Sequence, residues 1–258
     1  MHGLDLDRIR AGLRTRFVGR TLLYLPSAGS TMDVAKAEAE HGSAEGTVVL
    51  ADEQTAGRGR FGRRFVSPPG VNLYPTVILR PSLEGLKQLG IVASLAVARA
   101  VEECTGLRPS IKWPNDVLLD GRKFCGILIE TEFTGSRPRY SLVGIGVDVN
   151  LDVRAYPEIA AIATSLAAAL GREVSREDLL AALLNHLEAL YLHVQDGGSA
   201  VAEWKERLET LGKRVRVSAA GTMEEGVAED VDREGNLVLR RADGTTATMV
   251  AGEVTLRA

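Results

Sequence analysis

The sequence predicts an α+β protein: a mixed, mostly antiparallel sheet with helices packed on it, followed by a small β unit. Three observations carry this prediction. Between residues 110 and 150, strand-like runs follow one another through tight turns, which favours antiparallel pairing over a doubly wound sheet. Apolar residues at helical spacing mark two long segments, residues 86–104 and 176–196. After Gly212 the pattern changes to short alternating runs separated by turn residues.

The first fifth of the chain is expected to alternate helices and strands. Helical spacing predicts a first helix over residues 6–17. Ser30 and Thr31 supply an N-cap for a second helix over residues 32–40. Short apolar or β-branched runs predict strands over residues 21–25 and 47–51.

The middle of the chain is expected to supply most of the sheet. Residues 72–80 resemble a strand, in which Pro75 implies a sheet edge or a bulge because proline cannot donate to the ladder. A strand-like run over residues 110–119 leads into Asp120-Gly121, a hairpin turn pair. The returning strands are expected over residues 122–130 and 141–150.

Helices over residues 176–196 and 200–211 end the larger part of the chain. Four short strands follow, and they are expected over residues 214–218, 226–230, 237–240 and 246–250. We therefore predict a larger unit over residues 1–211 and a barrel-like β unit over residues 212–258. The second unit is too small to be very stable alone.

The composition excludes several classes of protein. The chain has 258 residues, 45% of them hydrophobic and 25% charged, with a net charge of −3. This balance argues against bulk binding to nucleic acid, and the single expected helix before residue 21 leaves no room for a DNA-binding domain. Cys104 and Cys125 are too few for a disulfide framework. With no leader pattern and no membrane-spanning apolar run, we expect a cytoplasmic protein with no membrane partner.

Residues 52–65 are the most unusual stretch, because arginine and glycine alternate there in an otherwise slightly acidic chain. Glycine lets a backbone approach a ligand closely, and arginine binds carboxylate or phosphate through paired hydrogen bonds. The stretch therefore indicates a loop that closes over a small anion. An ordinary basic surface, or a nucleic-acid-binding segment, stays open on the loop alone. The spacing Gly57-x-Gly59-x-x-Gly62 matches a dinucleotide fingerprint, but Ser67-Pro68-Pro69 follows where that motif requires a helix.

Four motifs in order resemble the biotin protein ligases. They are Gly57-Arg58-Gly59-Arg60-x-Gly62-Arg63, Lys112-Trp113-Pro114-Asn115-Asp116, Gly126-Ile127-Leu128-Ile129-Glu130 and Gly144-Ile145-Gly146-x-Asp148-x-Asn150. Ser30-Thr31 matches an early Ser-Thr pair of that family. The resemblance extends over residues 20–258. It implies a class II synthetase-like, biotin/lipoyl ligase-like sheet and an SH3-like C-terminal barrel.

The resemblance implies an ATP-dependent ligase of the monofunctional type, without a DNA-binding domain. Such enzymes form biotinyl-5′-AMP from biotin and MgATP, then transfer biotin to a lysine of a biotin carboxyl carrier protein. The family also implies a homodimer as one possible state.

The resemblance also implies roles for individual residues. The expected catalytic residues are Lys112, Arg58 and Arg60. Biotin would be bound by these three together with Ser30, Thr31, Gln54, Gly57, Gly126, Gly144 and Gly146. ATP would be bound by the same three together with Gly59, Arg63, Phe65, Asn115, Asp148 and Asn150.

The chain departs from the family pattern at three positions. Phe65 stands where tryptophan is frequent, and it can still stack on adenine with less area. Met32 replaces an asparagine and removes one polar contact. Asp148 also stands where asparagine is frequent, and an aspartate there would either ligate Mg²⁺ or weaken ATP binding.

Two other functions stay open. A lipoate or octanoate ligase would share the fold, but it would need a longer apolar slot. A non-catalytic biotin-binding or nucleic-acid-binding regulator would use the basic loop and the C-terminal unit. The net charge and the scarcity of aromatic residues among the arginines argue against nucleic acid.

Overall fold

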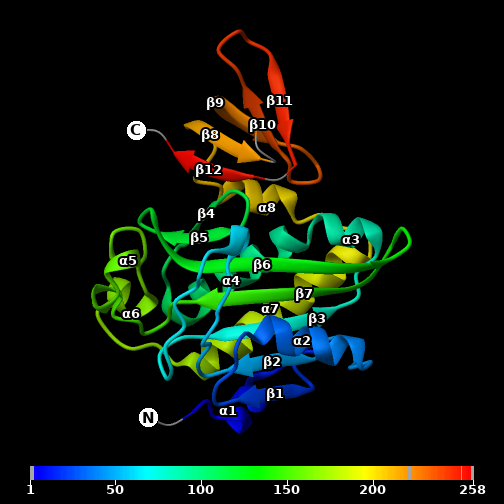
Figure 1. Ribbon diagram of the computed structural model, residues 1–258, viewed down its shortest axis with the longest axis vertical. Coiled ribbons are helices and arrows are strands. Elements are labelled where there is room, and N and C mark those ends of the chain that lie inside the picture. Colours follow the sequence, from blue (N-terminus) through cyan, green and yellow to red (C-terminus); the bar gives the residue numbers. More distant parts are fainter. Residues whose placement is uncertain (1–2, 220–221, 251, 257–258) are drawn as a thin grey trace.

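The computed structural model describes residues 3–219, 222–250 and 252–256, which form two sheets and the helices around the larger one (Figure 1). The strands of the larger sheet are β1 (Leu22–Leu25), β2 (Val48–Ala51), β3 (Tyr74–Leu79), β4 (Ser110–Lys112), β5 (Asp116–Leu119), β6 (Arg122–Thr134) and β7 (Arg137–Val147). The strands of the smaller sheet are β8 (Arg214–Ala219), β9 (Thr222–Val231), β10 (Leu237–Arg240), β11 (Thr246–Met249) and β12 (Glu253–Leu256). The α-helices are α1 (Leu6–Gly12), α2 (Thr31–Glu40), α3 (Leu83–Lys87), α4 (Leu89–Thr105), α5 (Pro157–Ala160), α6 (Leu166–Leu170), α7 (Arg176–Gln195) and α8 (Val201–Glu206).

The larger sheet is mixed, as predicted. Its strand order is β1-β2-β3-β7-β6-β5-β4, with β1 and β2 parallel and the other neighbours antiparallel. The smaller sheet is antiparallel in the order β11-β10-β9-β8-β12. The predicted fold class, an α+β protein with a mostly antiparallel sheet and a small C-terminal β unit, is confirmed.

The two faces of the larger sheet are covered by different helices (Figure 1). Because side chains alternate along a strand, Val143 and Ile145 of β7 face the large core that α4 and α7 complete. Leu142 faces the opposite side and packs with Met32 and Ala35 of α2. Gly144 and Gly146 continue the face of Leu142. The strand glycines therefore lie on the α2 side of the sheet.

Helix α2 begins where the sequence predicts. The hydroxyl of Ser30 accepts a hydrogen bond from the amide of Met32 at 3.3 Å, as an N-cap residue does. Ala35 and Ala39 are buried against the sheet, and their small side chains let the helix approach it closely. The N-terminus of α2 is thereby fixed beside the strand glycines.

The first helix is shorter than predicted, because it ends at Gly12 and not near residue 17. Beyond it, the chain follows the surface of α7 in an irregular path. The buried carboxylate of Glu188 accepts hydrogen bonds from the amides of Arg16, Phe17 and Val18. This one side chain replaces the backbone bonds that a further helical turn would have made.

Three other predictions about elements are corrected. The run over residues 110–119 is a hairpin of β4 and β5, because Trp113-Pro114-Asn115 turns the chain. The helix predicted over residues 200–211 ends at Glu206. Pro75 does not lie at a sheet edge, because β3 pairs with β2 on one side and β7 on the other. The continuous ladder with β7 begins at Thr76, one residue after the proline.

Candidate active site

A cavity of about 510 Å³ opens on the α2 side of the larger sheet, next to the smaller sheet. This volume is in the usual range for small-molecule sites. Its walls come from the N-terminus of α2, the arginine-glycine loop, the β4–β5 hairpin, strands β6 and β7, and the start of β12. The predicted site residues that line it are Ser30, Thr31, Gln54, Arg58, Gly59, Arg60, Arg63, Phe65, Lys112, Asn115, Gly126, Gly144, Gly146 and Asp148.

Two predicted residues are not among those that line the cavity. A Cβ atom on Gly57 would lie 2.7 Å from the carbonyl oxygen of Phe65, so this glycine allows two parts of the loop to touch. Asn150 lies beyond the end of β7, where its side-chain amide exchanges two hydrogen bonds with the backbone of Val174 at 2.9 and 3.0 Å. Both residues shape the surroundings of the cavity.

The floor of the cavity is a patch of strand backbone exposed by glycines. A Cβ atom on Gly146 would lie 2.6 Å from ring carbons of Phe65, and one on Gly144 would lie 2.6 Å from the sulfur of Met32. Phe65 therefore lies directly on the β7 backbone, with its ring edge-on to Tyr74 at a centroid distance of 6.4 Å. Any larger residue at either glycine would displace the side chain above it.

Neutral polar groups gather at the N-terminus of α2. The Gln54 carbonyl oxygen accepts hydrogen bonds from the amide and hydroxyl of Thr31 at 2.9 and 3.1 Å, and its amide nitrogen donates to Ser67. The buried hydroxyl of Thr76 donates to that of Thr31 at 2.9 Å. These contacts fix the orientation of uncharged donors and acceptors in this corner of the cavity.

The arginine-glycine loop folds over the cavity and contacts three different parts of the chain. Arg58 forms an ion pair with Asp33 of α2 at 2.7 Å. Arg60 donates to Asn115 in the β4–β5 turn at 2.7 Å and to the carbonyl of Gly252 at 3.1 Å. Burial lowers the pKa of the Arg60 guanidinium below its ordinary value, but the group stays charged at neutral pH.

The same loop has a tight turn and reaches the smaller sheet. Phe61 has a φ of 58°, a left-handed conformation that is uncommon for a bulky residue, and the residue is 64% exposed. Arg63 forms an ion pair with Glu253 at the start of β12. The glycine-rich segment is therefore a short irregular turn, and the exclusion of a dinucleotide-binding helix is confirmed.

Sequence reasoning missed a second lysine in the cavity, Lys123. Its ammonium nitrogen lies 2.6 Å from a carboxylate oxygen of Asp116, and a Cβ atom on Gly126 would lie 2.9 Å from that nitrogen. Simple alternation would place Lys123 on the core face with Cys125. A register shift between β5 and β6 buries both Phe124 and Cys125, and so turns Lys123 toward the cavity.

Lys112 lines the cavity from the end of β4. In the part of the chain that the structure describes, its ammonium has no hydrogen bond or ion pair. Two ammonium groups and several guanidinium groups thus surround one small space. Such a site favours ligands that carry a carboxylate and phosphates.

Two further sets of lining residues gave no pattern in the sequence. Glu253 and Val254 reach the cavity from β12, about 190 residues after the loop that they face. Ile159 and Ile162, around the end of α5, form an apolar rim, and Ile162 is 67% exposed. No single segment of the sequence could have indicated these contacts.

The residues of the cavity do not fit a protein-built magnesium site. At a nucleotide site, a protein usually holds magnesium through one or two free carboxylates, while water and phosphate oxygens complete the shell. Asp116 is paired with Lys123 and Glu253 with Arg63, while burial raises the pKa of Asp148 to about 8. Over the described ranges, no group of three or more His, Cys, Asp or Glu residues could hold a metal. The expected role of Asp148 as a magnesium ligand therefore does not agree with its surroundings.

No helix within residues 3–219, 222–250 and 252–256 is both long and apolar enough to cross a membrane.

Two protein families match this chain, one over the larger sheet and one over the smaller sheet. Residues 24–148 match the biotin/lipoate A/B protein ligase family, and residues 210–257 match the biotin protein ligase C-terminal domain. The bifunctional ligase/repressor BirA of Bacillus subtilis is 35% identical over 246 residues, which cover 93% of this chain and 76% of the relative. The biotin–[acetyl-CoA-carboxylase] ligase of Mycobacterium tuberculosis is 32% identical, over 97% of this chain and 98% of the relative.

A solved structure agrees with these relatives. The biotin protein ligase from Aquifex aeolicus in complex with biotin and ATP superposes with a TM-score of 0.79 at 29% identity, over 92% of this chain and 99% of that one. Sequence and fold agree over nearly the whole length. This chain belongs to the biotin protein ligase family.

Proposed function

We propose that this protein is an ATP-dependent biotin protein ligase. It joins biotin to ATP as biotinyl-5′-AMP and then transfers the biotinyl group to a lysine of a biotin carboxyl carrier protein. The observation that carries the proposal is the single cavity in which Arg58, Arg60, Arg63 and two lysines face a glycine floor beside neutral polar groups. The Aquifex aeolicus relative binds biotin and ATP, a carboxylate and a polyphosphate, which suit such a cavity.

In the first step, a biotin carboxylate oxygen attacks the α-phosphorus of ATP, and pyrophosphate leaves with the electrons of the broken P–O bond. Two anions must approach each other, so fixed cations lower the barrier most. We assign this role to Arg58, Arg60 and Lys112, and we add Lys123 because its ammonium lies on the cavity floor. Arg63 and Asn115 are assigned to the triphosphate.

In the second step, the neutral amine of the acceptor lysine attacks the acyl carbon of the mixed anhydride. AMP leaves with the electrons of the C–O bond, and the attacking nitrogen loses a proton as the amide forms. The adenylate must be protected from water until the acceptor arrives. We propose that the arginine-glycine loop provides this protection, with Gly57 and Gly59 allowing it to fold.

The two ends of the cavity suit the two substrates. We assign Ser30, Thr31 and Gln54 to the neutral ureido ring of biotin, above the backbone of Gly126, Gly144 and Gly146. Phe65 is assigned to adenine. Asp148 lines the same cavity, and Asn150 acts through its support of Val174. Mg²⁺ would be bound mainly by phosphate oxygens and water.

Residues 1–211 would form the catalytic unit and residues 212–258 an SH3-like β unit that completes the cavity. The enzyme would act in the cytoplasm on a carrier protein of a biotin-dependent carboxylase. Homodimer formation stays a prediction that light scattering with and without both substrates would test.

The test of the proposed function is ATP–pyrophosphate exchange with biotin, lipoate or octanoate added separately. We expect exchange with biotin alone. Exchange with lipoate or octanoate would keep the fold but contradict the proposed substrate. Absence of exchange with every acid would favour the non-catalytic binding protein.

The same assay distinguishes the two lysines. We expect Lys112→Ala and Lys123→Ala each to lower exchange by about two to three orders of magnitude, as the loss of a fixed charge near the reacting atoms does. Lys205→Ala is the matched control, because Lys205 of α8 pairs with Asp230 of β9 and is not among the cavity residues. Near-normal exchange by either cavity variant would remove that lysine from the proposed machinery.

A further inference from the structure

The least expected group in the cavity is the carboxyl of Asp148. The residue is 5% exposed, and it lines the cavity floor. Its Oδ1 atom accepts a hydrogen bond from the Asn72 amide nitrogen at 2.9 Å. Among the described residues, no cation forms an ion pair with it, and the nearby ammonium of Lys123 is paired with Asp116. A buried carboxylate without a counter-ion is strongly disfavoured relative to the neutral acid.

The position of the acid proton follows from Asn72. The Asn72 carbonyl oxygen accepts a hydrogen bond from the amide of Val149 at 3.0 Å, so its NH₂ group must be the part that faces Asp148. Oδ1 is therefore an acceptor. The proton of a neutral Asp148 belongs on Oδ2, which has no partner among the described residues and is not among the fully buried polar atoms that lack one.

We propose that Asp148 works as a neutral carboxylic acid, whose Oδ2–H donates a hydrogen bond to a phosphate oxygen of the nucleotide. This inference rests on the proposed function, and it replaces the expected role as a magnesium ligand. An ionised carboxylate at the same place would repel the phosphate. The acid instead offers one donor and leaves the charge of the nucleotide to the arginines and lysines.

The charged and titratable neighbours agree with a neutral acid. Burial raises the pKa of Asp148 to about 8, while Lys123 and the hydrogen bond from Asn72 oppose the shift. The other titratable groups around it are Asp116, Cys125 and Tyr74, together with the Asp52–Arg176 pair behind Asn72. A raised pKa means that the neutral form dominates below that value and is lost as the pH rises through it.

The first measurement is infrared difference spectroscopy of the free protein, wild type minus Asp148→Asn. We expect the carbonyl band of a carboxylic acid at about pH 7, lost through about pH 8 to 9. Asp152→Asn is the matched control, because Asp152 is exposed and its hydrogen bond from Arg154 lowers its pKa. A difference spectrum with only carboxylate bands at about pH 7 would overturn the inference. This readout needs neither substrate, so it stands even if the proposed function fails.

The second measurement tests the contact with phosphate. α,β-Methylene-ATP, which cannot release pyrophosphate, is titrated calorimetrically into the biotin-loaded protein in two buffers of different ionisation enthalpy. At about pH 9 we expect wild type to take up close to one proton more than Asp148→Asn, and its affinity to fall about fivefold between pH 8 and 9 relative to that variant. Equal proton uptake by both proteins would contradict the contact. Failure of wild type to bind the analogue at all would contradict the proposed function instead.

Discussion

Two glycines of β7 leave room for the side chains that lie on the floor of the cavity. Gly146 lies under the ring of Phe65, and Gly144 lies under the flexible end of Met32. The two positions share a strand face and differ only in the side chain above them. They therefore allow a matched comparison of the two ends of the cavity.

We predict that Gly146→Ala raises the KM for ATP about tenfold, because the new methyl group displaces a rigid ring and overpacking costs about 1–3 kcal/mol. Gly144→Ala should instead raise the KM for biotin. This effect should be smaller, because the thioether of Met32 can move aside. Exchange kinetics at varied ATP and biotin concentrations measure both. Equal effects of the two variants on both substrates would contradict the assignment of the two ends.

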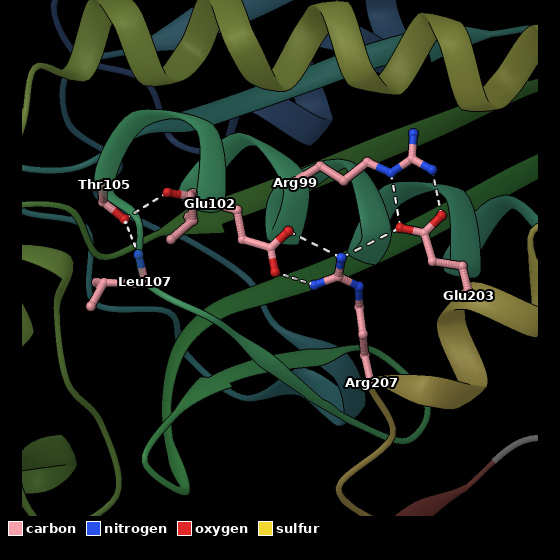
Figure 2. Close-up of polar contacts among 7 residues, drawn as sticks. Arg99, Glu102, Thr105, Leu107, Glu203 and Arg207 are labelled. Carbon is pink, nitrogen blue, oxygen red and sulfur yellow. Dashed lines mark hydrogen bonds and ion pairs between the residues drawn. The ribbon is translucent and has the colours of Figure 1, made fainter.

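At the scale of elements, strand β4 is held from outside the sheet. The segment just after α8 pairs with it through the backbone. The amide of Ile111 donates to the carbonyl of Arg207 at 2.7 Å, and the amide of Glu209 donates to the carbonyl of Ile111 at 2.9 Å. Figure 2 shows Arg207 between Glu102 of α4 and Glu203 of α8, with Arg99 binding the other side of Glu203. This ion-pair cluster fixes the segment against α4. Lys112 is therefore carried by a strand with both edges paired.

Thr210 connects this segment to the β4–β5 turn. It is fully buried, and its hydroxyl accepts a hydrogen bond from the amide of Trp113 at 2.9 Å. We predict that Thr210→Val lowers stability by about 1–3 kcal/mol, because the Trp113 amide stays buried without a partner. We also expect about a tenfold loss of kcat for exchange, measured well below the melting temperature, because Lys112 and Asn115 flank that amide.

Thr210→Ser is the matched control, because it keeps the hydroxyl and loses one methyl group. It should restore kcat more fully than stability. A Thr210→Val protein that is less stable but has normal kcat would mean that the segment supports only the fold.

At the scale of the whole molecule, the smaller sheet completes the cavity. The carbonyl of Gly252 and the carboxylate of Glu253 bind two loop arginines, and the indole of Trp113 donates to the carbonyl of Gly235 at 3.0 Å. Figure 1 places this sheet at the end of the larger sheet that carries β4 and β5. The smaller sheet thus contacts both the arginine-glycine loop and the β4–β5 turn that follows Lys112.

These contacts also show where sequence reasoning succeeds and where it does not. The arginine-glycine loop and the glycines of β7 form local patterns that can be compared with a known family, and it is this resemblance that predicts their place in one site. Lys123 faces the cavity only because of a register shift, which reverses simple alternation. Glu253 meets Arg63 across 190 residues, and Asn150 turns away to Val174. Long-range pairing and small backbone irregularities carry no local pattern from which they could be predicted.

The ion pair between Arg63 and Glu253 lets us test whether the smaller sheet holds the loop closed. The Arg63 side chain is 65% exposed and that of Glu253 is 38% exposed, so the pair should add no more than about 1 kcal/mol to stability. We predict that Glu253→Gln leaves the melting temperature nearly unchanged but releases biotinyl-AMP about three- to tenfold faster, because the loop opens more often. Glu229→Gln is the matched control: it breaks a similar exposed pair with Arg240 in the same sheet, away from the cavity residues. If Arg63→Ala acts through the same contact, the double variant of Arg63→Ala and Glu253→Gln should release the adenylate no faster than Arg63→Ala alone. Additive effects, or equal release by wild type and Glu253→Gln, would mean that the smaller sheet does not control the loop.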